Sequence, residues 1–393
     1  MFLSHLVLSE FRNYKELDIA LRPGLFIFHG DNAQGKTNLL EAVGMLATAT
    51  SFHAGSDREV VNWNAPERIA RLRGEVERSA GSAQVEVVVS DPSPPQVSQN
   101  ARPAFELPAN TPRKRFKVNG VPKRTMELIG QMKVVLFAPT DLHLVDGPPD
   151  ERRRFLDRAL CQVQPRYCQA LVKYRKIVLQ RAALLKRVRE RQDDPHMLDY
   201  LDEQLTLHAG MIIYERSRMI EALNQRANAF QQTISGGQEE LVIVYRPSFK
   251  VEYEWSAFEA PEHYRAQLRD IRRKEIQQGV CLLGPHRDDL EFQVNGVNML
   301  MYGSRGQQRT AALSAKLAEL AYMRSCTGDE PILLLDDVFS ELDQARRSFL
   351  LRQILEHEQV FLTTTDLAGF PADIMERAHL YHVSSGTLQK ESA

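Results

Sequence analysis

The chain has 393 residues, of which 43% are hydrophobic, so its length exceeds that of one ordinary core and two lobes are expected. Its formal net charge of −1 at pH 7 says nothing by itself about partners, so the placement of charge along the chain matters more. Its 4 cysteines show no C-x-x-C spacing and no accompanying histidine cluster, which argues against a zinc site or a disulfide framework.

The N-terminal segment predicts three strands. Residues 3–9 and 17–21 alternate apolar and polar side chains, and residues 25–29 form an apolar run of the kind that makes a buried strand. This segment carries several charged residues, unlike the apolar core of a signal peptide. The sequence contains no run of about 18 apolar residues, which a transmembrane helix would require. We therefore expect a mixed sheet at the start of a soluble, cytoplasmic protein that has no membrane partner.

The segment GDNAQGKT follows the third predicted strand and precedes the helical pattern NLLEAVGMLA. It fits G-x-x-x-x-G-K-[ST], and a strand before it and a helix after it are the context in which this pattern binds phosphates. Lys36 would reach the β- and γ-phosphates and the Thr37 hydroxyl would hold magnesium, whereas a chance match in a glycine-bearing turn is the alternative. The predicted nucleotide-binding residues are Gly30, Asp31, Asn32, Ala33, Gln34, Gly35, Lys36 and Thr37.

Further strands and turns follow in chain order. RLRGEVE at 71–77 and AQVEVVVS at 83–90 predict strands, and the six prolines between Pro92 and Pro112 predict a long loop outside the core. The dipeptide Asn119-Gly120 stands between two short alternating arms, which is a strong hairpin signal. This part of the chain therefore continues the sheet of the first lobe.

From Glu151 the sequence takes on helical periodicity, which the segment Asp193 to Pro195 interrupts. A second helical stretch ends at the Ser-Gly-Gly of Ser235, so two long antiparallel helices are expected. Strand character returns at 281–286 and 289–297, and we interpret the segment GPHRDDL there as a structural network rather than a catalytic one. The expected lobes are 1–150 with 280–393 for the nucleotide, and 151–279 for the helices.

Positive charge is concentrated in this helical part. Residues 151–191 hold thirteen Arg or Lys against three acidic residues, a density that attracts a phosphate backbone, and a second basic cluster flanks the predicted hairpin. Solvated helix faces with ordinary ion pairs are the alternative for both clusters. No base-reading helix or aromatic platform accompanies them, so the sequence leaves single-stranded, duplex and gapped DNA open as partners. The candidate DNA contacts are Arg181, Lys186, Arg187, Arg189, Arg113, Lys114 and Arg115.

The segment PILLLDDVFSELD supplies the acidic partner that a phosphate loop needs. Four aliphatic residues, 332–335, end in Asp336 and Asp337. Asp336 would hold the metal together with Thr37, and Asp337 would position or deprotonate an attacking water. A buried strand that runs into an acidic turn is the alternative. We take Asp336 and Asp337 as the candidate catalytic residues.

A small polar turn, YGSRGQQR, precedes a long helical run at about residue 305. A helix start of this kind is an anion-binding surface. Because the chain already has one phosphate loop, we expect this turn to meet the nucleotide of a second copy in a head-to-tail homodimer. An ordinary N-capped helix is the alternative. The residues of the turn are Ser304, Arg305, Gly306 and Gln307.

These motifs together resemble a known family. SRGQQR resembles the signature turn of the ABC-type ATPases, and LLLDDVFSELD resembles their acidic strand with the loop beyond it. GDNAQGKTNLLEA is similar to the phosphate loop of their chromosome-maintenance, SMC-like branch. Within that branch the chain resembles the RecF family, through FRNY at 11–14, SFH at 51–53, FAPTDLHLVDGPPDERRRFLD at 137–157 and GPHRDDL at 284–290.

The resemblance implies an α/β fold, an ABC-type P-loop ATPase head with an inserted, mainly helical second lobe that carries a short antiparallel helical arm. It implies ATP and magnesium as ligands, ATP-driven dimerisation, weak DNA-stimulated hydrolysis, and loading of the recombinase in DNA repair and replication with RecR and RecO. By the same resemblance, Ser340 and Asp343 belong to a loop that communicates between subunits. The chain departs from the family pattern at Ala33, where glycine is common, and at Asp337, where many ABC proteins have glutamate. It also has Thr363 to Thr365 where transport ATPases place a switch histidine.

Two other functions are compatible with a phosphate loop. A metabolic kinase would need an acceptor pocket and a lid, and it would leave the turn at Ser304 unexplained. A scaffold that binds nucleotide only for structure would not need Asp337. A nucleotide-dependent DNA-binding switch accounts for all of these motifs.

Overall fold

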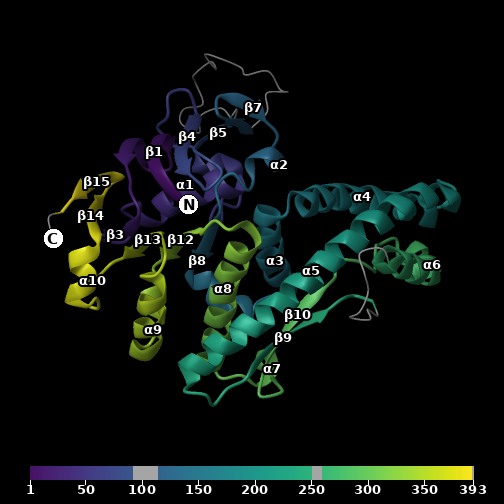
Figure 1. Ribbon diagram of the computed structural model, residues 1–393. Helices are drawn as coiled ribbons and strands as arrows, with labels where there is room; N and C mark the ends of the chain where they lie inside the picture. Colours follow the sequence, from purple (N-terminus) through teal and green to yellow (C-terminus); the bar gives the residue numbers. More distant parts are fainter. Residues whose placement is uncertain (92–113, 250–258, 392–393) are drawn as a thin grey trace. The chain divides into compact units, whose positions relative to one another are not determined.

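The computed structural model describes residues 1–91, 114–249 and 259–391 (Figure 1). Internal contacts divide the chain into two compact units, which are residues 1–139 with 327–393 (the first unit) and residues 140–326 (the second unit). The lobes expected from the sequence differ from this division, because they placed 280–326 with the nucleotide. These residues group with the helices because strand β10 (Asp289–Val294) pairs with β9 (Leu241–Arg246) along its whole length.

Among the described residues, two six-stranded sheets form the first unit. Sheet A is antiparallel and has the order β2-β1-β4-β5-β6-β7. Sheet B has the order β15-β14-β3-β13-β12-β8, in which only the edge strand β15 is antiparallel to its neighbour. The strands are β1 (Phe2–Phe11), β2 (Tyr14–Ala20), β4 (Ile69–Glu77), β5 (Ala83–Ser90), β6 (Lys114–Val118) and β7 (Val121–Lys123) in sheet A. Sheet B contains β3 (Gly24–His29), β8 (Val134–Phe137), β12 (Ile332–Asp336), β13 (Gln359–Thr364), β14 (His379–Ser384) and β15 (Thr387–Lys390).

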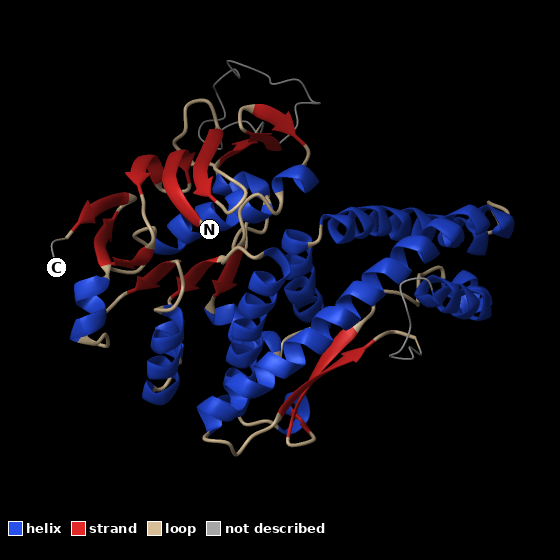
Figure 2. Ribbon diagram, viewed as in Figure 1, coloured by secondary structure: helices blue, strands red, loops and turns tan. Residues whose placement is uncertain are grey.

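Helix α1 (Lys36–Thr48) lies between sheets A and B (Figure 2). It contacts β4 and β5 on one side and β8, β12 and β13 on the other, and every residue from Leu39 to Ala47 is buried. A helix that is buried on both sides is stable only inside a core, which is what the two sheets provide. Shorter helices complete the unit: α2 (Thr125–Leu128), α9 (Gln344–Ile354) and α10 (Ala372–Arg377).

The strands and the hairpin predicted for this unit are confirmed. Residues 3–9 and 25–29 lie within β1 and β3, and the predicted strand at 17–21 lies within β2 except for its last residue, because β2 ends at Ala20. Asn119 and Gly120 have φ angles of 51° and 76° and close the hairpin of β6 and β7, and a tight hairpin turn of this type needs positive φ at both positions. The predicted proline-rich loop lies outside the described residues.

Helices make up most of the second unit. Helices α4 (Pro165–Arg189) and α5 (Leu198–Ser235) run antiparallel, since Arg181 contacts Asp202 whereas Arg216 contacts Tyr167. Helix α6 (Glu259–Gln278) packs along α5, and these three helices form the arm. The other elements are α3 (Pro149–Val163), α7 (Met299–Tyr302), α8 (Arg305–Thr327) and a three-stranded sheet, β11-β10-β9, with β11 at Val297–Asn298.

Two predictions for this unit need correction. The helical run expected from Glu151 is divided at Gln164, whose φ of −131° is not helical, because the ring of a following proline excludes the α conformation. The strand predicted at 281–286 is wrong, because Gly284 turns the chain with a φ of 126° and its N–H donates to Ser248 Oγ instead of to a strand. The predicted end of the second helix is confirmed, because α5 ends at Ser235 and Gly236 follows it with a φ of 65°.

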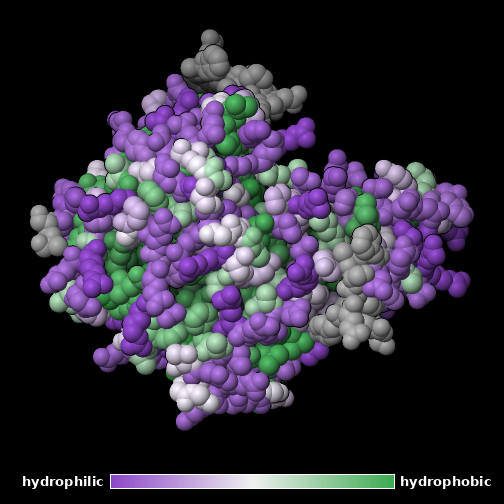
Figure 3. All heavy atoms as spheres, viewed as in Figure 1, coloured by the Kyte–Doolittle hydropathy of each residue, from purple (hydrophilic) through white to green (hydrophobic). Residues whose placement is uncertain are grey.

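The face drawn in Figure 3 mixes hydrophilic and hydrophobic residues. Across residues 1–91, 114–249 and 259–391, no helix combines the length and the apolar character that crossing a membrane requires.

Candidate nucleotide site

The phosphate loop joins the end of β3 to the first turn of α1. Gly30 and Gly35 have φ angles of 144° and 115°, which residues with a Cβ rarely adopt. A Cβ at Gly30 would lie 2.5 Å from the carbonyl oxygen of Val383, and one at Gly35 would lie 2.6 Å from Asn13 Nδ2. Both glycines are therefore required by close packing against neighbouring segments as well as by the turn itself.

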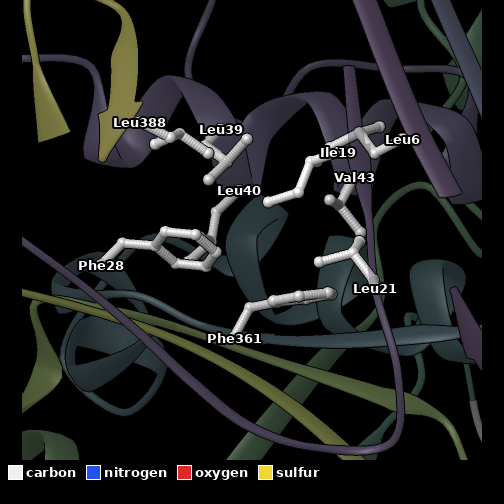
Figure 4. Close-up of a pocket in the computed structure, with 9 residues that line it drawn as sticks. All are labelled: Leu6, Ile19, Leu21, Phe28, Leu39, Leu40, Val43, Phe361 and Leu388. Atoms are coloured by element: carbon white, nitrogen blue, oxygen red, sulfur yellow. The ribbon is translucent and has the colours of Figure 1, made fainter. Parts of the chain in front are cut away.

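The helix that begins at this loop, α1, is packed between the two sheets. Leu39, Leu40 and Val43 of α1 point toward a small apolar space between the sheets (Figure 4). The same space is lined by Phe28 and Phe361 from sheet B, and α1 packs directly against β12 and β13 of that sheet. Close packing of this kind fixes the direction in which the first N–H groups of the helix point.

Lys36 folds back over the loop. Its Nζ donates hydrogen bonds of 2.6 Å to the carbonyl of Gly30 and 2.7 Å to that of Asp31, and the residue is 7% exposed. Burial lowers the pKa of Lys36, while the charges of Asp337, Asp31 and Asp336 oppose that shift. Within the described residues, its hydrogen-bond partners are thus uncharged carbonyls, and phosphate oxygens could replace them.

The structure brings Asp336 to the loop from a distant part of the sequence. Thr37 Oγ1 donates to Asp336 Oδ1 at 2.9 Å, and Thr363 Oγ1 donates to the same oxygen at 2.8 Å. Asp336 reaches this place because β12 pairs with β13, which in turn pairs with β3. A hydroxyl and a carboxylate side by side are the hard oxygen ligands that Mg²⁺ prefers, so Thr37 and Asp336 fit this ion.

Asp337 leaves the strand in a different direction. Its φ of 48° lies in the left-handed region, its N–H donates to Thr363 Oγ1 at 3.0 Å, and its carbonyl accepts from Ser340 Oγ at 2.7 Å. Burial, reinforced by the charge of Asp336, raises the pKa of Asp337, while Ser340 and Lys36 oppose the shift. Ser340 and Asp343 are both exposed, and Asp343 caps α9 by accepting from the N–H of Arg346 at 2.9 Å.

Two segments that hold the loop were not assigned a role from the sequence. Asn13 Nδ2 donates to the carbonyl of Gln34 at 2.8 Å, and the hydroxyl of Tyr14 donates to that of Gly35 at 2.9 Å. On the other side, the N–H of Ser385 donates to Gln34 Oε1 at 2.8 Å. Burial raises the pKa of Tyr14, which keeps this hydroxyl a donor. The motif FRNY was a visible signal, but only the fold shows that its turn lies against the loop.

The signature turn belongs to the second unit, at the start of α8. The N–H of Gln307 donates to Ser304 Oγ at 3.2 Å, and the N–H of Ser304 donates to Gln307 Oε1 at 3.1 Å. This reciprocal pair is a capping box, so the ordinary helix cap that was the alternative is present. Ser304 and Arg305 are exposed, and an exposed helix start keeps its capacity to bind an anion.

The candidate DNA contacts separate into exposed and buried residues. Lys186, Arg187 and Arg189 are exposed on α4, where the surface is mainly hydrophilic (Figure 3). Arg181 was predicted among them, and this is wrong, because its side chain is 0% exposed. Its Nε donates to Asp202 Oδ1 at 2.6 Å and its Nη2 lies 2.6 Å from Glu275 Oε2.

The cluster beside the hairpin also divides. Lys114 was predicted as a DNA contact, and this is wrong, because its Nζ donates to the carbonyl of Ala49 at 2.8 Å and lies 2.6 Å from Asp57 Oδ1. Arg115 is exposed on β6. Arg113 lies outside the described residues.

The segment GPHRDDL forms a buried hydrogen-bond network, as predicted. His286 Nδ1 lies 2.6 Å from the hydroxyl of Tyr174, and Arg216 Nη1 donates to the carbonyl of Pro285 at 2.8 Å. The hydroxyl of Tyr245 donates to Asp288 Oδ2. Burial lowers the pKa of His286 to about 4, so this imidazole is neutral at pH 7.

Comparisons with known proteins agree with these observations. The model of the RecF/RecN/SMC N terminal domain family matches residues 2–383. The chain is 43% identical to the DNA replication and repair protein RecF of Chloroflexus aurantiacus, over 98% of this chain and 99% of that protein. It is 41% identical to the protein of the same description from Halalkalibacterium halodurans, over 100% of both chains.

Solved structures show the same fold. The structure of the recombination mediator protein RecF-ATP in the RecFOR pathway superposes with a TM-score of 0.85 at 30% identity, covering 100% of this chain and 98% of that one. The Smc head domain derived from Pyrococcus furiosus gives a TM-score of 0.54 at 14% identity, covering 100% of this chain and 96% of that one, a likeness of fold alone. The predicted α/β ATPase head with an inserted helical part is therefore confirmed.

Proposed function

This chain belongs to the RecF family of DNA replication and repair proteins, and from that premise we propose that it is an ATP-dependent, DNA-binding switch of recombinational repair. Two copies close head to tail around ATP and hold DNA, and slow hydrolysis of ATP releases them. The RecFOR pathway named for the solved relative supports RecO and RecR as partners, in whose company the protein would help to load the recombinase.

The first unit holds the nucleotide. The amides of residues 30–37 and the Nζ of Lys36 bind the β- and γ-phosphates, and Thr37 with Asp336 hold magnesium, which neutralises charge on the phosphate oxygens when bound. Asp337 orients the attacking water and accepts its proton, so its carboxylate must be ionised before the step. The raised pKa of Asp337 supports this role, because a base works best when its pKa lies near the working pH.

The second unit serves the nucleotide of the other copy. The Ser304 hydroxyl and the first N–H groups of α8 bind the γ-phosphate held by the partner, so that neither copy has a complete site alone. Exposure of Ser304 and Arg305 supports this role. Ser340 and Asp343, which are also exposed, contact the facing copy and report its state to Asp337.

The single observation that carries the proposal is the 2.9 Å hydrogen bond from Thr37 Oγ1 to Asp336 Oδ1. It joins the phosphate loop to the acidic strand across 299 positions of the sequence, directly beside Lys36 and Asp337. A metal-dependent nucleotide site needs these four groups together. A scaffold that binds nucleotide only for structure would need neither acid at this place.

Measurement of molecular mass in solution tests the proposal. The protein is measured without nucleotide, with ADP and with ATP, each with and without duplex DNA, and a dimer is expected only with ATP. Ser304→Arg serves as the matched control, because it should block dimerisation while each monomer still binds ATP through its own Lys36. A monomer under all conditions would refute the switch, and loss of ATP binding in the Ser304→Arg monomer would show that the turn acts within one copy.

A further inference from the structure

Two loops at the carboxyl edge of sheet B are joined by one arginine of α9. The first, residues 337–342 after β12 (the acid loop), carries Asp337 and Ser340, and the second, residues 365–370, follows β13 (the β13 loop). Arg347 Nη2 donates to the carbonyl of Phe339 in the acid loop at 2.7 Å. A Cβ built on Gly369 of the β13 loop would lie 2.5 Å from Arg347 Nη1, so the guanidinium rests directly against that backbone.

An aromatic pair closes the same junction. The rings of Phe339 and Phe370 lie edge to face, with their centroids 5.4 Å apart and their planes at 63°. Phe339 belongs to the acid loop and Phe370 to the β13 loop, so the two loops touch through their side chains as well as through Arg347. An aromatic pair of this geometry contributes attraction beyond simple burial, so it helps to hold the two loops together.

Stability alone does not explain this position of Arg347. Its Nε is buried and has no hydrogen-bond partner among the residues that the structure describes, and an unsatisfied buried donor is unfavourable wherever it occurs. A solvent-exposed position would avoid that penalty, as it does for Arg352 on the last turn of the same helix. The guanidinium is thus held by the hydrogen bond from Nη2 to Phe339 and by packing against Gly369, while its Nε gains nothing from this position.

The other end of the acid loop is held by β13 as well. Thr363 Oγ1 accepts from the N–H of Asp337 and donates to Asp336 Oδ1. Thr363 therefore fixes the first residue of the acid loop, and Arg347 fixes its middle at Phe339. Between these two attachments the orientation of Asp337 has little freedom left.

We propose that Arg347 is a positioning residue for ATP hydrolysis. Its side chain holds the acid loop against the β13 loop and so keeps Asp337 directed at the attacking water. The inference rests on the proposed function and deepens it, because it assigns the link between these loops to a residue that touches neither nucleotide nor water. A shift in either loop then moves the other through the guanidinium. Loss of the link should lower kcat and leave KM for ATP unchanged.

The glycine beneath Arg347 offers a clean test. Gly369 does not have a positive φ, so its backbone accepts alanine, but the added methyl group would displace Arg347 Nη1. We expect Gly369→Ala and Arg347→Ala each to lower kcat by about tenfold to 100-fold, since small misplacements at a reacting centre have effects of this size. In the double variant the two losses should not add, because Gly369→Ala acts only through Arg347. Arg352→Ala, on the same helix, is the matched control and should leave kcat unchanged.

Amide hydrogen exchange of the nucleotide-free protein provides a readout that does not depend on hydrolysis. Arg347→Ala should raise the exchange rate in both 337–342 and 365–370, while the phosphate loop exchanges as in the parent. Parental exchange in both loops would overturn the proposal, and so would additive losses of kcat or an increase in KM alone. Absence of ATP hydrolysis in the parental protein would instead refute the proposed function, and the exchange rates would still decide whether Arg347 links the two loops.

Discussion

Two buried cations, Lys36 in the phosphate loop and Arg181 in the helical arm, show opposite uses of burial in one chain. The Nζ of Lys36 contacts two backbone carbonyls, at 2.6 and 2.7 Å. The guanidinium of Arg181 lies between the carboxylates of Asp202 and Glu275, each at 2.6 Å. Both side chains were selected from the sequence as contacts for phosphate, and only Lys36 is placed to make one.

The difference lies in how each charge is compensated. Burial without an ion pair disfavours the charged form, and burial lowers the pKa of Lys36 accordingly. Burial has the same tendency at Arg181, but its two carboxylates outweigh it and raise the pKa of Arg181 above the ordinary value. An anionic ligand would therefore relieve the cost at Lys36, whereas Arg181 already has its counter-charges and serves the packing of the arm.

The largest expected effect is that of Lys36→Ala on ATP binding. Hydrogen bonds between charged groups contribute about 1.5 to 3 kcal/mol each, so loss of two phosphate contacts should weaken ATP binding by about 3 to 6 kcal/mol. Isothermal titration calorimetry measures this affinity. The melting temperature should change little, because loss of the two hydrogen bonds to the carbonyls of Gly30 and Asp31 is offset by removal of a buried cation. Near-normal ATP affinity would contradict the assignment of the loop.

Arg181→Met should show the reverse pattern. Removing one partner leaves Asp202 and Glu275 without their buried counter-charge, and breaking a buried pair destabilises a protein by about 3 to 5 kcal/mol. Thermal unfolding is the measurement, with ATP affinity expected to match the parent. Lys186→Met, an exposed position on the same helix, is the control and should leave the melting temperature unchanged. A parental melting temperature for Arg181→Met would show that the arm does not depend on this ion pair.

The contrast also marks what the sequence could predict. The phosphate loop is a contiguous motif, so eight neighbouring residues determine both its turn and the position of Lys36. The acidic strand is equally local, because an apolar run that ends in Asp336 specifies a buried strand and its exit. The partners of Arg181 come from two other helices, and no local pattern in α4 indicates that Asp202 and Glu275 lie beside it.

The same reason accounts for the other differences. The turn that holds the phosphate loop through Asn13 and Tyr14 is visible as a motif, but its contact with Gln34 and Gly35 depends on how sheet A packs over α1. The proline at 165 indicates a break in the helix at the residue before it. The helical periodicity on both sides of Pro165 instead predicts one continuous helix, and this second signal was followed. Residues 281–286 are apolar like a strand, yet side-chain hydrogen bonds hold them in place of a strand partner.

Asp337→Asn and Glu275→Gln extend the comparison from the two cations to two carboxylates. Unlike Glu275, Asp337 forms no salt bridge among the described residues, so Asp337→Asn should preserve thermal stability and ATP binding while slowing hydrolysis by at least about 100-fold, the usual share of a general base. If this variant releases phosphate at the parental rate, a residue other than Asp337 activates the water. Glu275→Gln should give the opposite result, a lower melting temperature with normal hydrolysis.

The pH dependence of hydrolysis follows from the same residue. The base must be ionised, so the parental rate should fall as the pH falls through the pKa of Asp337. Because burial raises that pKa, the fall should occur at a higher pH than for an ordinary aspartate. The residual rate of Asp337→Asn should lack this acid limb. An acid limb that persists in Asp337→Asn would assign it to a different group.

The smallest effect is expected at the exposed cations of α4 that were predicted, together with Arg181, to contact DNA. Lys186, Arg187 and Arg189 remain on the surface of α4, and exposed cations bind a phosphate backbone mainly by releasing its counterions. Reversing all three to glutamate should weaken binding to every DNA sequence alike and reduce the slope of log affinity against log salt by about one unit per lost contact. Arg115→Glu beside the hairpin compares the two clusters, and ATP affinity should not change in either variant. An unchanged salt slope would show that the arm does not contact DNA.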